Sequence, residues 1–516
     1  MRAAFPSAPP ITLARAPLAL LDRLADPLRS PWCWAALALL AVASAVVSPR
    51  VSHDSLFYLD MGEGILAGRG PSSYYLTLNA FHVPNDRLSW PPFYPLLLAV
   101  GMAAGLDPIW AVRLVSAASF VATALLLYAT TAALGRRALG PPAMALWVLL
   151  PLRAEVFSAA WSEPPFIALC MGSLLFLARA VRGERPRYRA LVAAGTLAGL
   201  AVLTRYLGCA MVATGIACVL YARVSGRLGR GVRPLVAALA AFCAPAAVVA
   251  APWFISSYLR FGHFTTGRPP SDLGPLQNGA ALAAVVAADC ALPCAIVAAV
   301  LLVPRLRALH PRRPGALPAG WMAPAAFVVL YAITLVAVRS IDDFEPIYYR
   351  FASPLYAPLA LLMLAALAWV TGRDRPDQPL PGASLLALAG GVLLLGVIGP
   401  GQIALDQLRA PAPPARPVDA WITTRTRSTD LFIGADPSWV RFSFGRPVLR
   451  GYQETPLTPR AVARFLRAHG AAFSDWYVIA AESDPPWWTD DSSGALRLTR
   501  LYDDGAFVIY HASLAG

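Results

Sequence analysis

Long apolar runs, separated by short polar loops, recur along the chain from about residue 32 to residue 404. A helix needs about 20 predominantly apolar residues to cross a bilayer. The pattern therefore predicts an all-α polytopic membrane protein of about eleven transmembrane helices. The predicted spans are 32–48, 109–134, 138–153, 160–181, 190–206, 207–222, 234–257, 280–303, 320–338, 351–371 and 384–404.

One long polar stretch, the loop 49–92, interrupts this pattern after the first run. Within it, Ser55 to Ala67 predicts a short helix along the membrane interface, which ends at Gly68. The apolar run Phe93 to Leu106 is too short to cross a bilayer, so we expect it to lie against the membrane or to enter part-way.

The composition changes again near residue 405. A Pro-rich linker leads into the segments LFIGA (431–435), WYVIAA (476–481) and AFVIYHA (506–512), which are typical of strands. The segment 458–470 predicts an amphipathic helix. The predicted domains are therefore a cytoplasmic arm (1–31), a transmembrane catalytic domain with its outer loop (32–404) and a small extracytoplasmic α/β domain (405–516).

Charge sets the predicted orientation. The chain is 57% hydrophobic and 14% charged, with a mean hydropathy of +0.56 and a net charge of +14, and every basic residue is Arg. The Arg residues cluster in alternate short loops, which is the positive-inside pattern and not a nucleic-acid-binding surface. It places the N-terminus inside and loop 49–92 outside, provided that 190–222 is two spans. The Arg-rich loops are 136–137, 182–189, 223–233, 305–313 and 373–375.

No cofactor signature stands out. The seven Cys lie in or beside apolar runs without a C-x-x-C spacing, which is typical of small buried side chains. His53 beside Asp54 is the one place where a divalent metal could bind, and the sequence leaves that question open.

Carboxylates and Arg residues recur at the predicted outer ends of the spans. Ionisable groups at a membrane edge are functional candidates because their burial is expensive. A carboxylate can take a proton from an attacking hydroxyl, and Arg can bind a phosphate with two hydrogen bonds. This combination suits a reaction on a phosphate-linked donor. The candidates are Asp54, Glu155, Glu163, Arg205, Glu345 and Arg350.

Each candidate also has a purely structural interpretation. Asp54 could cap the helix that begins near Ser55, and Glu163 could be a first-turn acid favoured by the helix dipole. Arg205 could reach the interface, and Arg350 could pair with Glu345. The nearby acidic residues of the loop could be solvated or locally paired, and its aromatic residues could form an interfacial belt. These are Asp60, Glu63, Tyr58, Tyr74, Tyr75, Trp90 and Tyr94.

Several of these segments resemble the GT-C glycosyltransferases. SHDSLFYLDMGEGILAGRG resembles the first outer loop of that superfamily, and WPPFYPLLLA resembles its aromatic-Pro-Pro-x-Tyr-Pro stretch. The likeness continues in order through WSEPPFIALCMGSLLFLAR, GLAVLTRYLG, PWFISSYLRFGHFTTG and YYRFASPLYAPLALL. It is greatest to bacterial members akin to protein O-mannosyltransferases and to the lipid A aminoarabinose transferase. Protein O-mannosyltransferases carry an Asp-Glu pair in this loop, whereas here Ser55 follows Asp54.

The resemblance implies transfer of a sugar from a polyprenyl-phosphate carrier to an acceptor hydroxyl of a glycan, lipid or protein, with inversion, at the outer face of the bacterial plasma (inner) membrane. By the same resemblance Asp54 is the general base, and Glu163 or Glu155 is a second carboxylate. Arg205 and Arg350 hold the phosphate of the lipid donor. The residues implied to shape the substrate site are Tyr58, Trp90, Tyr94 and Glu345.

Three other functions remain open from the sequence. A transporter or flippase would place charges near mid-membrane and show paired halves. An envelope assembly protein without catalytic activity would not bring Asp54 within one sugar's width of Arg205 and Arg350. A related ligase or polymerase would use a diphosphate-linked donor.

Overall fold

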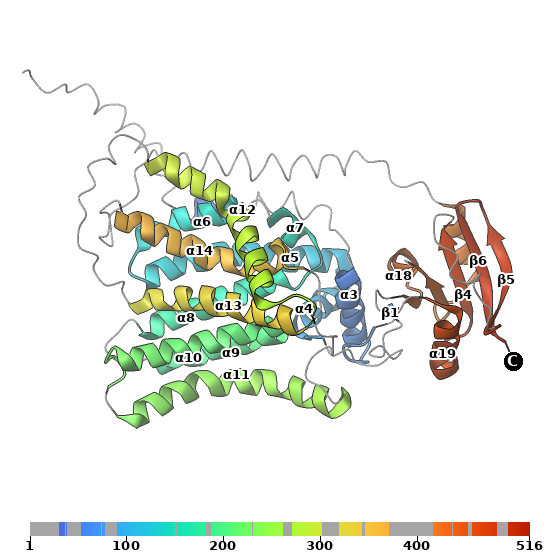
Figure 1. The fold of residues 1–516 in the computed structure, drawn as a ribbon, viewed down its shortest axis with the longest axis horizontal. Helices are drawn as coiled ribbons and strands as arrows, with labels where there is room; N and C mark the ends of the chain where they lie inside the picture. Colours follow the sequence, from blue (N-terminus) through green and yellow to red (C-terminus); the bar gives the residue numbers. More distant parts are fainter. Residues whose placement is uncertain are drawn as a thin grey trace, which may run out of the picture.

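A computed structural model gives the structure of the chain. Its helices form a bundle at one end of the molecule, and a mixed sheet lies at the other end (Figure 1). The residues that it describes are 30–36, 38, 53–73, 75–77, 90–149, 153–181, 187–229, 231–261, 271–301, 319–342, 346–370, 416–435, 437–451, 457–481 and 494–515.

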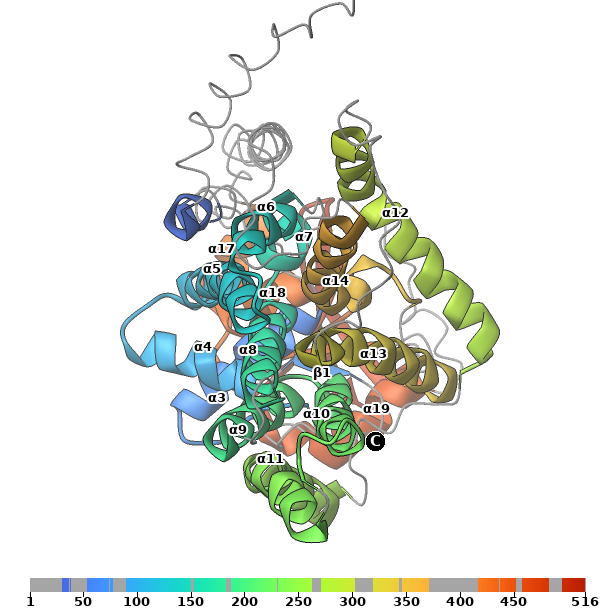
Figure 2. The same ribbon diagram turned by 90° about the vertical axis from the view of Figure 1, so that its left-hand side faces the viewer.

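The bundle helices run roughly side by side along the long axis of the molecule (Figure 1), and Figure 2 shows most of them end-on, with α12 slanting along one side. Apolar side chains on their outer faces, such as Val248, Val329 and Ile333, are exposed, as expected for surfaces that face lipid. The helices are α5 (Pro108–Ala133), α6 (Gly140–Leu149), α8 (Glu163–Val181), α9 (Tyr188–Thr204), α10 (Cys209–Val224), α11 (Val232–Phe261), α12 (Pro275–Leu301), α13 (Met322–Ile341) and α14 (Tyr349–Val370).

The prediction of a multi-pass membrane protein is confirmed. Among the described residues, 6 helices are long and apolar enough to cross a membrane, and α4 (Phe93–Ala103) and α9 are shorter apolar helices. The predicted span 138–153 is a helix of only 10 residues, α6. The predicted span 384–404 and most of 32–48 lie outside the described residues, so the total of eleven stays a prediction.

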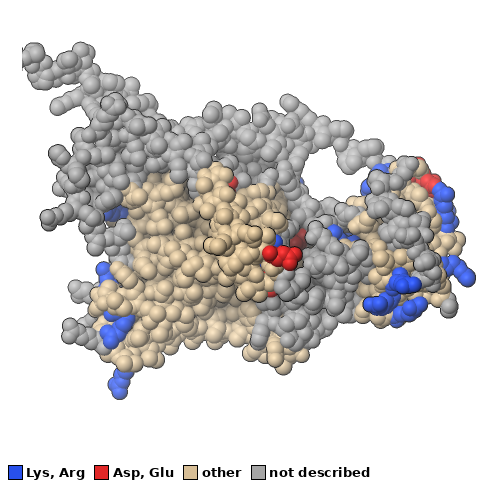
Figure 3. Space-filling model, in the orientation of Figure 1, with Lys and Arg blue, Asp and Glu red and all other residues tan. Residues whose placement is uncertain are grey.

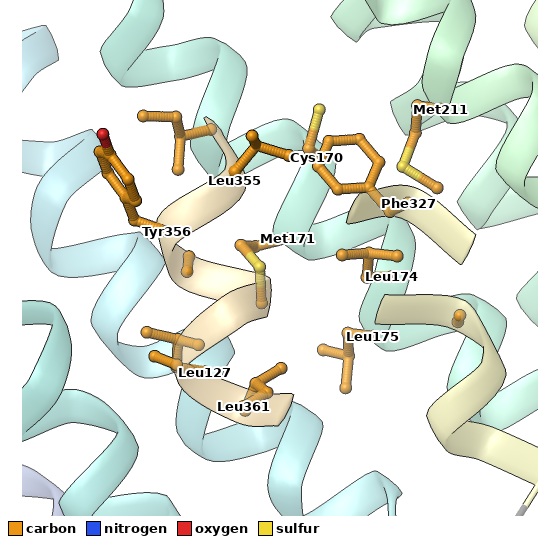
Figure 4. Packing of buried hydrophobic residues seen from close by; sticks show 14 of the residues in the cluster. Leu127, Cys170, Met171, Leu174, Leu175, Met211, Phe327, Leu355, Tyr356 and Leu361 are labelled. Atoms are coloured by element: carbon orange, nitrogen blue, oxygen red, sulfur yellow. The ribbon is translucent and has the colours of Figure 1, made fainter. Parts of the chain in front are cut away.

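Helix α8 is the centre of the bundle. It packs against α5, α9, α10, α13 and α14, and most of its side chains are buried. Figure 4 shows Met171 and Leu174 of α8 among apolar side chains of α5, α13 and α14. The first turn of α8 therefore lies in the middle of one end of the bundle.

A sharp reversal separates α9 from α10. Arg205 has extended backbone angles (φ −152°, ψ 135°), and the 3-10 turn Tyr206–Gly208 follows it. A Cβ atom at Gly208 would lie 2.5 Å from the Ala201 carbonyl carbon, so only glycine fits this turn. The predicted division of 190–222 into two helices, on which the Arg pattern depends, agrees with this reversal.

The sheet has six strands in the order β1-β3-β2-β4-β6-β5. Strands β1, β3, β2 and β4 are parallel, whereas β4, β6 and β5 are antiparallel. The strands are β1 (Tyr75–Thr77), β2 (Leu431–Gly434), β3 (Val448–Arg450), β4 (Trp476–Ala481), β5 (Leu496–Asp503) and β6 (Phe507–Leu514). Three of them correspond to the predicted strands, whereas β1, β3 and β5 were missed.

Helices cover both faces of the sheet. On one face, α17 (Pro417–Arg425) and α18 (Ser438–Phe444) pack over Phe432 and Tyr477. On the other, α19 (Pro459–His469) packs over Ile433 and Val478. The alternation of neighbouring residues between the two faces follows the period of two of a strand.

Loop 49–92 contributes two elements at the junction of bundle and sheet. Helix α3 (His53–Leu66) runs across the end of the bundle next to the sheet, roughly perpendicular to the bundle helices (Figure 1). It ends at Leu66, one residue before the predicted last residue Ala67, and Gly68 follows with a φ of +74°. Strand β1 pairs with β3, so the sheet includes a segment that lies far outside the predicted domain 405–516.

Candidate active site

Helix α3 brings Asp54 to the end of the bundle. Asp54 stands in the first turn, and its side chain is 32% exposed. Its Oδ2 atom accepts a hydrogen bond of 2.6 Å from Nη2 of Arg350, a residue near the start of α14. The predicted meeting of these two residues from distant parts of the chain is therefore present in the structure.

Glu163 occupies the first turn of the central helix α8 and is fully buried. The two prolines after it fit a helix start, because the first turn requires no backbone N–H donor. Its Oε1 atom accepts a hydrogen bond from Nε of Arg350 and lies 2.5 Å from Nη1 of Arg205. Its Oε2 atom has no hydrogen-bond partner among the described residues.

Arg205 reaches this carboxylate from the reversal between α9 and α10. Its Nη1 atom also donates to the Ser162 hydroxyl over 3.2 Å. Arg205 makes no other hydrogen bond to the described residues, and its Cζ atom lies 5.8 Å from the centroid of the Phe351 ring. Its side chain is 12% exposed, against 4% for Arg350.

Arg350 connects the two carboxylates, Asp54 and Glu163. Its guanidinium bridges Asp54 and Glu163 and lies over the Trp161 ring, with its Cζ atom 4.2 Å from the ring centroid. A planar guanidinium with several fixed donors suits such a bridge, whereas a lysine ammonium does not. Two carboxylates and two guanidinium groups therefore form one connected network with balanced formal charge.

An aromatic cluster supports the network. The Tyr58 hydroxyl lies 3.0 Å from the Ser162 hydroxyl, and the Tyr58 ring contacts the rings of Trp90 and Tyr94 edge-on. Burial raises the pKa of Tyr58 to about 12, so the phenol stays protonated at neutral pH. Tyr58 and Tyr94 are buried, so in this structure they support the site and do not line an open surface.

Three predicted residues cannot be placed at the site. Glu155 lies in α7 (Arg153–Ser158), but its side chain is outside the described residues, as is that of His53 in α3. Glu345 lies outside the described residues altogether. The described part of the chain contains no group of three or more His, Cys, Asp or Glu side chains that could hold a metal ion.

The sequence analysis missed three residues that touch this region. Ser162 joins Arg205 to Tyr58, and Trp161 covers Arg350. Ser162 and Trp161 stand one and two positions before Glu163 in the sequence, which could have singled them out. Arg441 belongs to α18 in what we call the sheet domain, which comprises the six strands together with α17, α18 and α19. It pairs with Asp60 and Glu63 of α3, and nothing local in the sequence marks it.

A family model described as dolichyl-phosphate-mannose-protein mannosyltransferase matches residues 89–255. The match includes Glu163 and Arg205 but not Asp54 or Arg350. Comparison with curated protein sequences gives no significant match.

Two solved structures are similar over nearly the whole chain. ArnT from Cupriavidus metallidurans, in a crystal structure bound to undecaprenyl phosphate, is 14% identical with a TM-score of 0.57, and the match covers 93% of this chain and 97% of ArnT. The arabinofuranosyltransferase AftD from Mycobacteria is 18% identical with a TM-score of 0.50, and the match covers 93% of this chain but only 39% of AftD.

The chain has the GT-C fold. The matched family and the matched structures are glycosyltransferases, so the predicted resemblance to these enzymes is confirmed. Within the GT-C fold of this chain, the Asp54–Arg350–Glu163–Arg205 network occupies one end of the helical bundle, beneath α3.

Proposed function

We propose that the chain transfers a sugar from a polyprenyl-phosphate carrier to an acceptor hydroxyl. The observation that carries the proposal is the bridge that Arg350 makes between Asp54 and Glu163. Glu163 also pairs with Arg205. Similarity to ArnT, whose structure contains undecaprenyl phosphate, supports the class of donor.

Asp54 acts as the general base. Arg350 orients the carboxylate, while about a third of the side chain is exposed and can meet an acceptor. As the acceptor oxygen attacks the anomeric carbon, its proton passes to Asp54, and the bond between that carbon and the phosphate oxygen breaks. Attack opposite the leaving phosphate gives inversion at the anomeric carbon.

Arg205 and Arg350 stabilise the leaving group. The departing polyprenyl phosphate gains negative charge, and guanidinium groups held in advance stabilise that charge without reorganisation. The Arg205 side chain is the more exposed of the two, whereas Arg350 is enclosed by Asp54, Glu163 and Trp161. Glu163 holds both guanidinium groups in one place, and we assign it this positioning role.

The site faces away from the cytoplasm. Arg side chains gather at the end of the bundle remote from the sheet (Figure 3), in the loops around 136–137, 187–189 and 223–233. This distribution supports a cytoplasmic position for that end by the positive-inside rule, and hence our proposal that the network and the sheet domain lie on the outer side. For a bacterial chain this is the outer face of the plasma membrane.

The class of acceptor follows less directly. Protein O-mannosyltransferases carry an Asp-Glu pair in this loop, whereas here Ser55 follows Asp54, so no second carboxylate stands next to the base in the sequence. We therefore place a glycan or lipid hydroxyl ahead of a protein side chain as acceptor.

The test is a transfer assay with the purified protein in sealed proteoliposomes, in which sugar transfer and movement of the donor across the bilayer can both be measured. Wild type is given synthetic polyprenyl-phosphate pentoses and hexoses, the corresponding nucleotide sugars and polyprenyl-diphosphate sugars, together with an envelope lipid extract as acceptor. We expect turnover only with the polyprenyl-phosphate pentoses or hexoses, and it should release free polyprenyl phosphate. Turnover with the diphosphate donors alone would assign the chain to a ligase, and movement of intact donor across the bilayer without release would assign it to a flippase.

A further inference from the structure

Helix α3 lies between two hydrophobic cores. Leu56, Phe57 and Met61 pack into the sheet domain beside α17 and α18. Tyr58 and Leu59 pack toward α4 and α5 of the bundle. The helix that presents Asp54 is therefore held from both sides, and its position depends on the sheet domain as well as on the bundle.

The apolar contacts of α3 with the sheet domain are joined by one polar connection. Arg441 of α18 donates from Nε to the Oδ1 atom of Asp60 over 2.7 Å, and its Nη2 atom lies 2.6 Å from the same oxygen. Nη2 also donates to Oε2 of Glu63 over 2.9 Å. The second oxygen of Asp60 accepts a hydrogen bond of 2.9 Å from Ser73, which lies between α3 and β1.

This connection is largely withdrawn from water. The side chains of Arg441 and Asp60 are 9% and 6% exposed, whereas Glu63 is 45% exposed. Burial raises the pKa of Glu63, and the neighbouring Arg441 opposes that rise. A forked, buried guanidinium–carboxylate contact fixes direction and distance, which apolar packing alone does not.

We propose that Arg441 is a positioning residue of the transferase site. It fixes the position of α3 along and around its axis, so that Asp54 reaches Arg350. Asp60 lies six residues after Asp54 on the same helix, about 9 Å along its axis. A helix transmits a rotation or slide from one of these residues to the other, and a misplacement of about 1 Å in an active site can lower a rate about 100-fold. This inference rests on the proposed role of Asp54.

The alternative is a contact that only stabilises the sheet domain. Arg441 also donates from Nη1 to the Gly445 carbonyl at the end of its own short helix, which fits a structural role. The two roles differ in what a substitution changes. A structural residue alters unfolding, whereas a positioning residue alters kcat at constant donor KM.

The test compares Arg441→Met with Arg441→Lys and with Arg464→Met, a matched control on the exposed face of α19. For Arg441→Met the unpaired, buried Asp60 should lower the unfolding temperature. At a temperature where the variant stays folded, we expect kcat for polyprenyl phosphate release per folded molecule to fall at least 10-fold, with donor KM within 2-fold. Arg441→Lys recovers part of kcat, and Arg464→Met behaves as wild type. Wild-type kcat in Arg441→Met overturns the proposal, as does a loss of kcat that follows a matching loss of folded protein.

A second variant approaches the contact from α3 and protects the test against misfolding of Arg441→Met. Asp60→Asn keeps the shape of the side chain and weakens the contact, and we expect the same selective fall in kcat. In an Asp54→Asn background, Arg441→Met should add no further loss, because the group that it positions has been removed. Independent, multiplicative losses would reject the proposal.

These variants also separate the two proposals. Full activity of Asp54→Asn alone would reject the proposed role of Asp54 and, with it, the positioning role. Loss of activity in Asp54→Asn, with wild-type activity in both Arg441→Met and Asp60→Asn, would reject the positioning role only.

Discussion

The Nη2 atom of Arg350 lies 2.6 Å from the Oδ2 atom of Asp54, although 296 positions separate the two residues in the sequence. One belongs to helix α3 of loop 49–92 and the other to the first turn of α14. Through Glu163 the same guanidinium is connected to Arg205. An envelope protein that merely binds ligands through its sheet domain gives no reason for this convergence, whereas transfer from a phosphate-linked donor needs it.

Removing the more exposed guanidinium should weaken donor binding. In Arg205→Gln both the bound donor phosphate and the departing phosphate lose charge-assisted hydrogen bonds, so we expect donor KM to rise about 10- to 100-fold and kcat to fall as well. Steady-state kinetics with a polyprenyl-phosphate sugar measure this. Arg189→Gln, near the opposite end of α9, is the control. An unchanged KM in Arg205→Gln would remove the residue from the phosphate site.

Neutralising the central carboxylate should destabilise the protein. Glu163→Gln leaves two guanidinium groups close together in a buried place, and breaking a buried ion pair costs about 3–5 kcal/mol. We expect a clearly lower unfolding temperature together with lost activity. Glu63→Gln changes a half-exposed carboxylate and should shift stability by less than about 1 kcal/mol. Equal stability of Glu163→Gln and Glu63→Gln would contradict the buried ion pairs described for Glu163.

Tyr58 should make the stability of the folded protein depend on pH in the alkaline range. Its pKa is about 12 in the folded chain and 10.0 ordinarily, so the folded state holds the phenolic proton more tightly. The corresponding stabilisation is present below pH 10 and is lost as pH rises through 12; two pKa units amount to about 3 kcal/mol. The free energy of unfolding of wild type, measured relative to that of Tyr58→Phe, should therefore fall by up to about 3 kcal/mol between pH 10 and 12. A constant difference across that range would show that Tyr58 is not buried as described.

The reversal that presents Arg205 should not tolerate a side chain at Gly208. In Gly208→Ala the new Cβ atom would meet the backbone of Ala201 at 2.5 Å, so the turn must open and Arg205 must move. Overpacking of this kind costs about 1–3 kcal/mol. We expect reduced stability and a raised donor KM. Gly279→Ala, a helix glycine with open space around it, should be neutral or stabilising.

Much of the architecture could be predicted because its signals are local. Apolar runs defined the bundle helices, and Gly68 indicated the end of α3 to within one residue. Helix α6 begins at Gly140, two residues after the start of its predicted span, and the two prolines that follow fit a first helical turn. Strand β1 has only three residues and acquires its conformation by pairing with β3, which no local pattern announces.

The site was foreseeable in part for the same reason. Membrane-edge carboxylates and arginines are conspicuous in an apolar chain, and this property led to Asp54, Glu163, Arg205 and Arg350. Arg441 lies in a soluble domain, where arginine is ordinary. Its partner Asp60 was read as solvated or locally paired, but it is buried and paired across 381 positions. That contact forms through the packing of α3 against the sheet domain, so it could not be predicted from the local sequence.

The most direct measurement is the rate of polyprenyl phosphate release by Asp54→Asn, beside wild type and the control Asp107→Asn. Asp107 caps α5, and asparagine preserves the cap. Loss of a general base should slow transfer about 100- to 10,000-fold while leaving donor binding and unfolding temperature near their wild-type values, and Asp107→Asn should remain active. Release by Asp54→Asn at the wild-type rate would contradict the account.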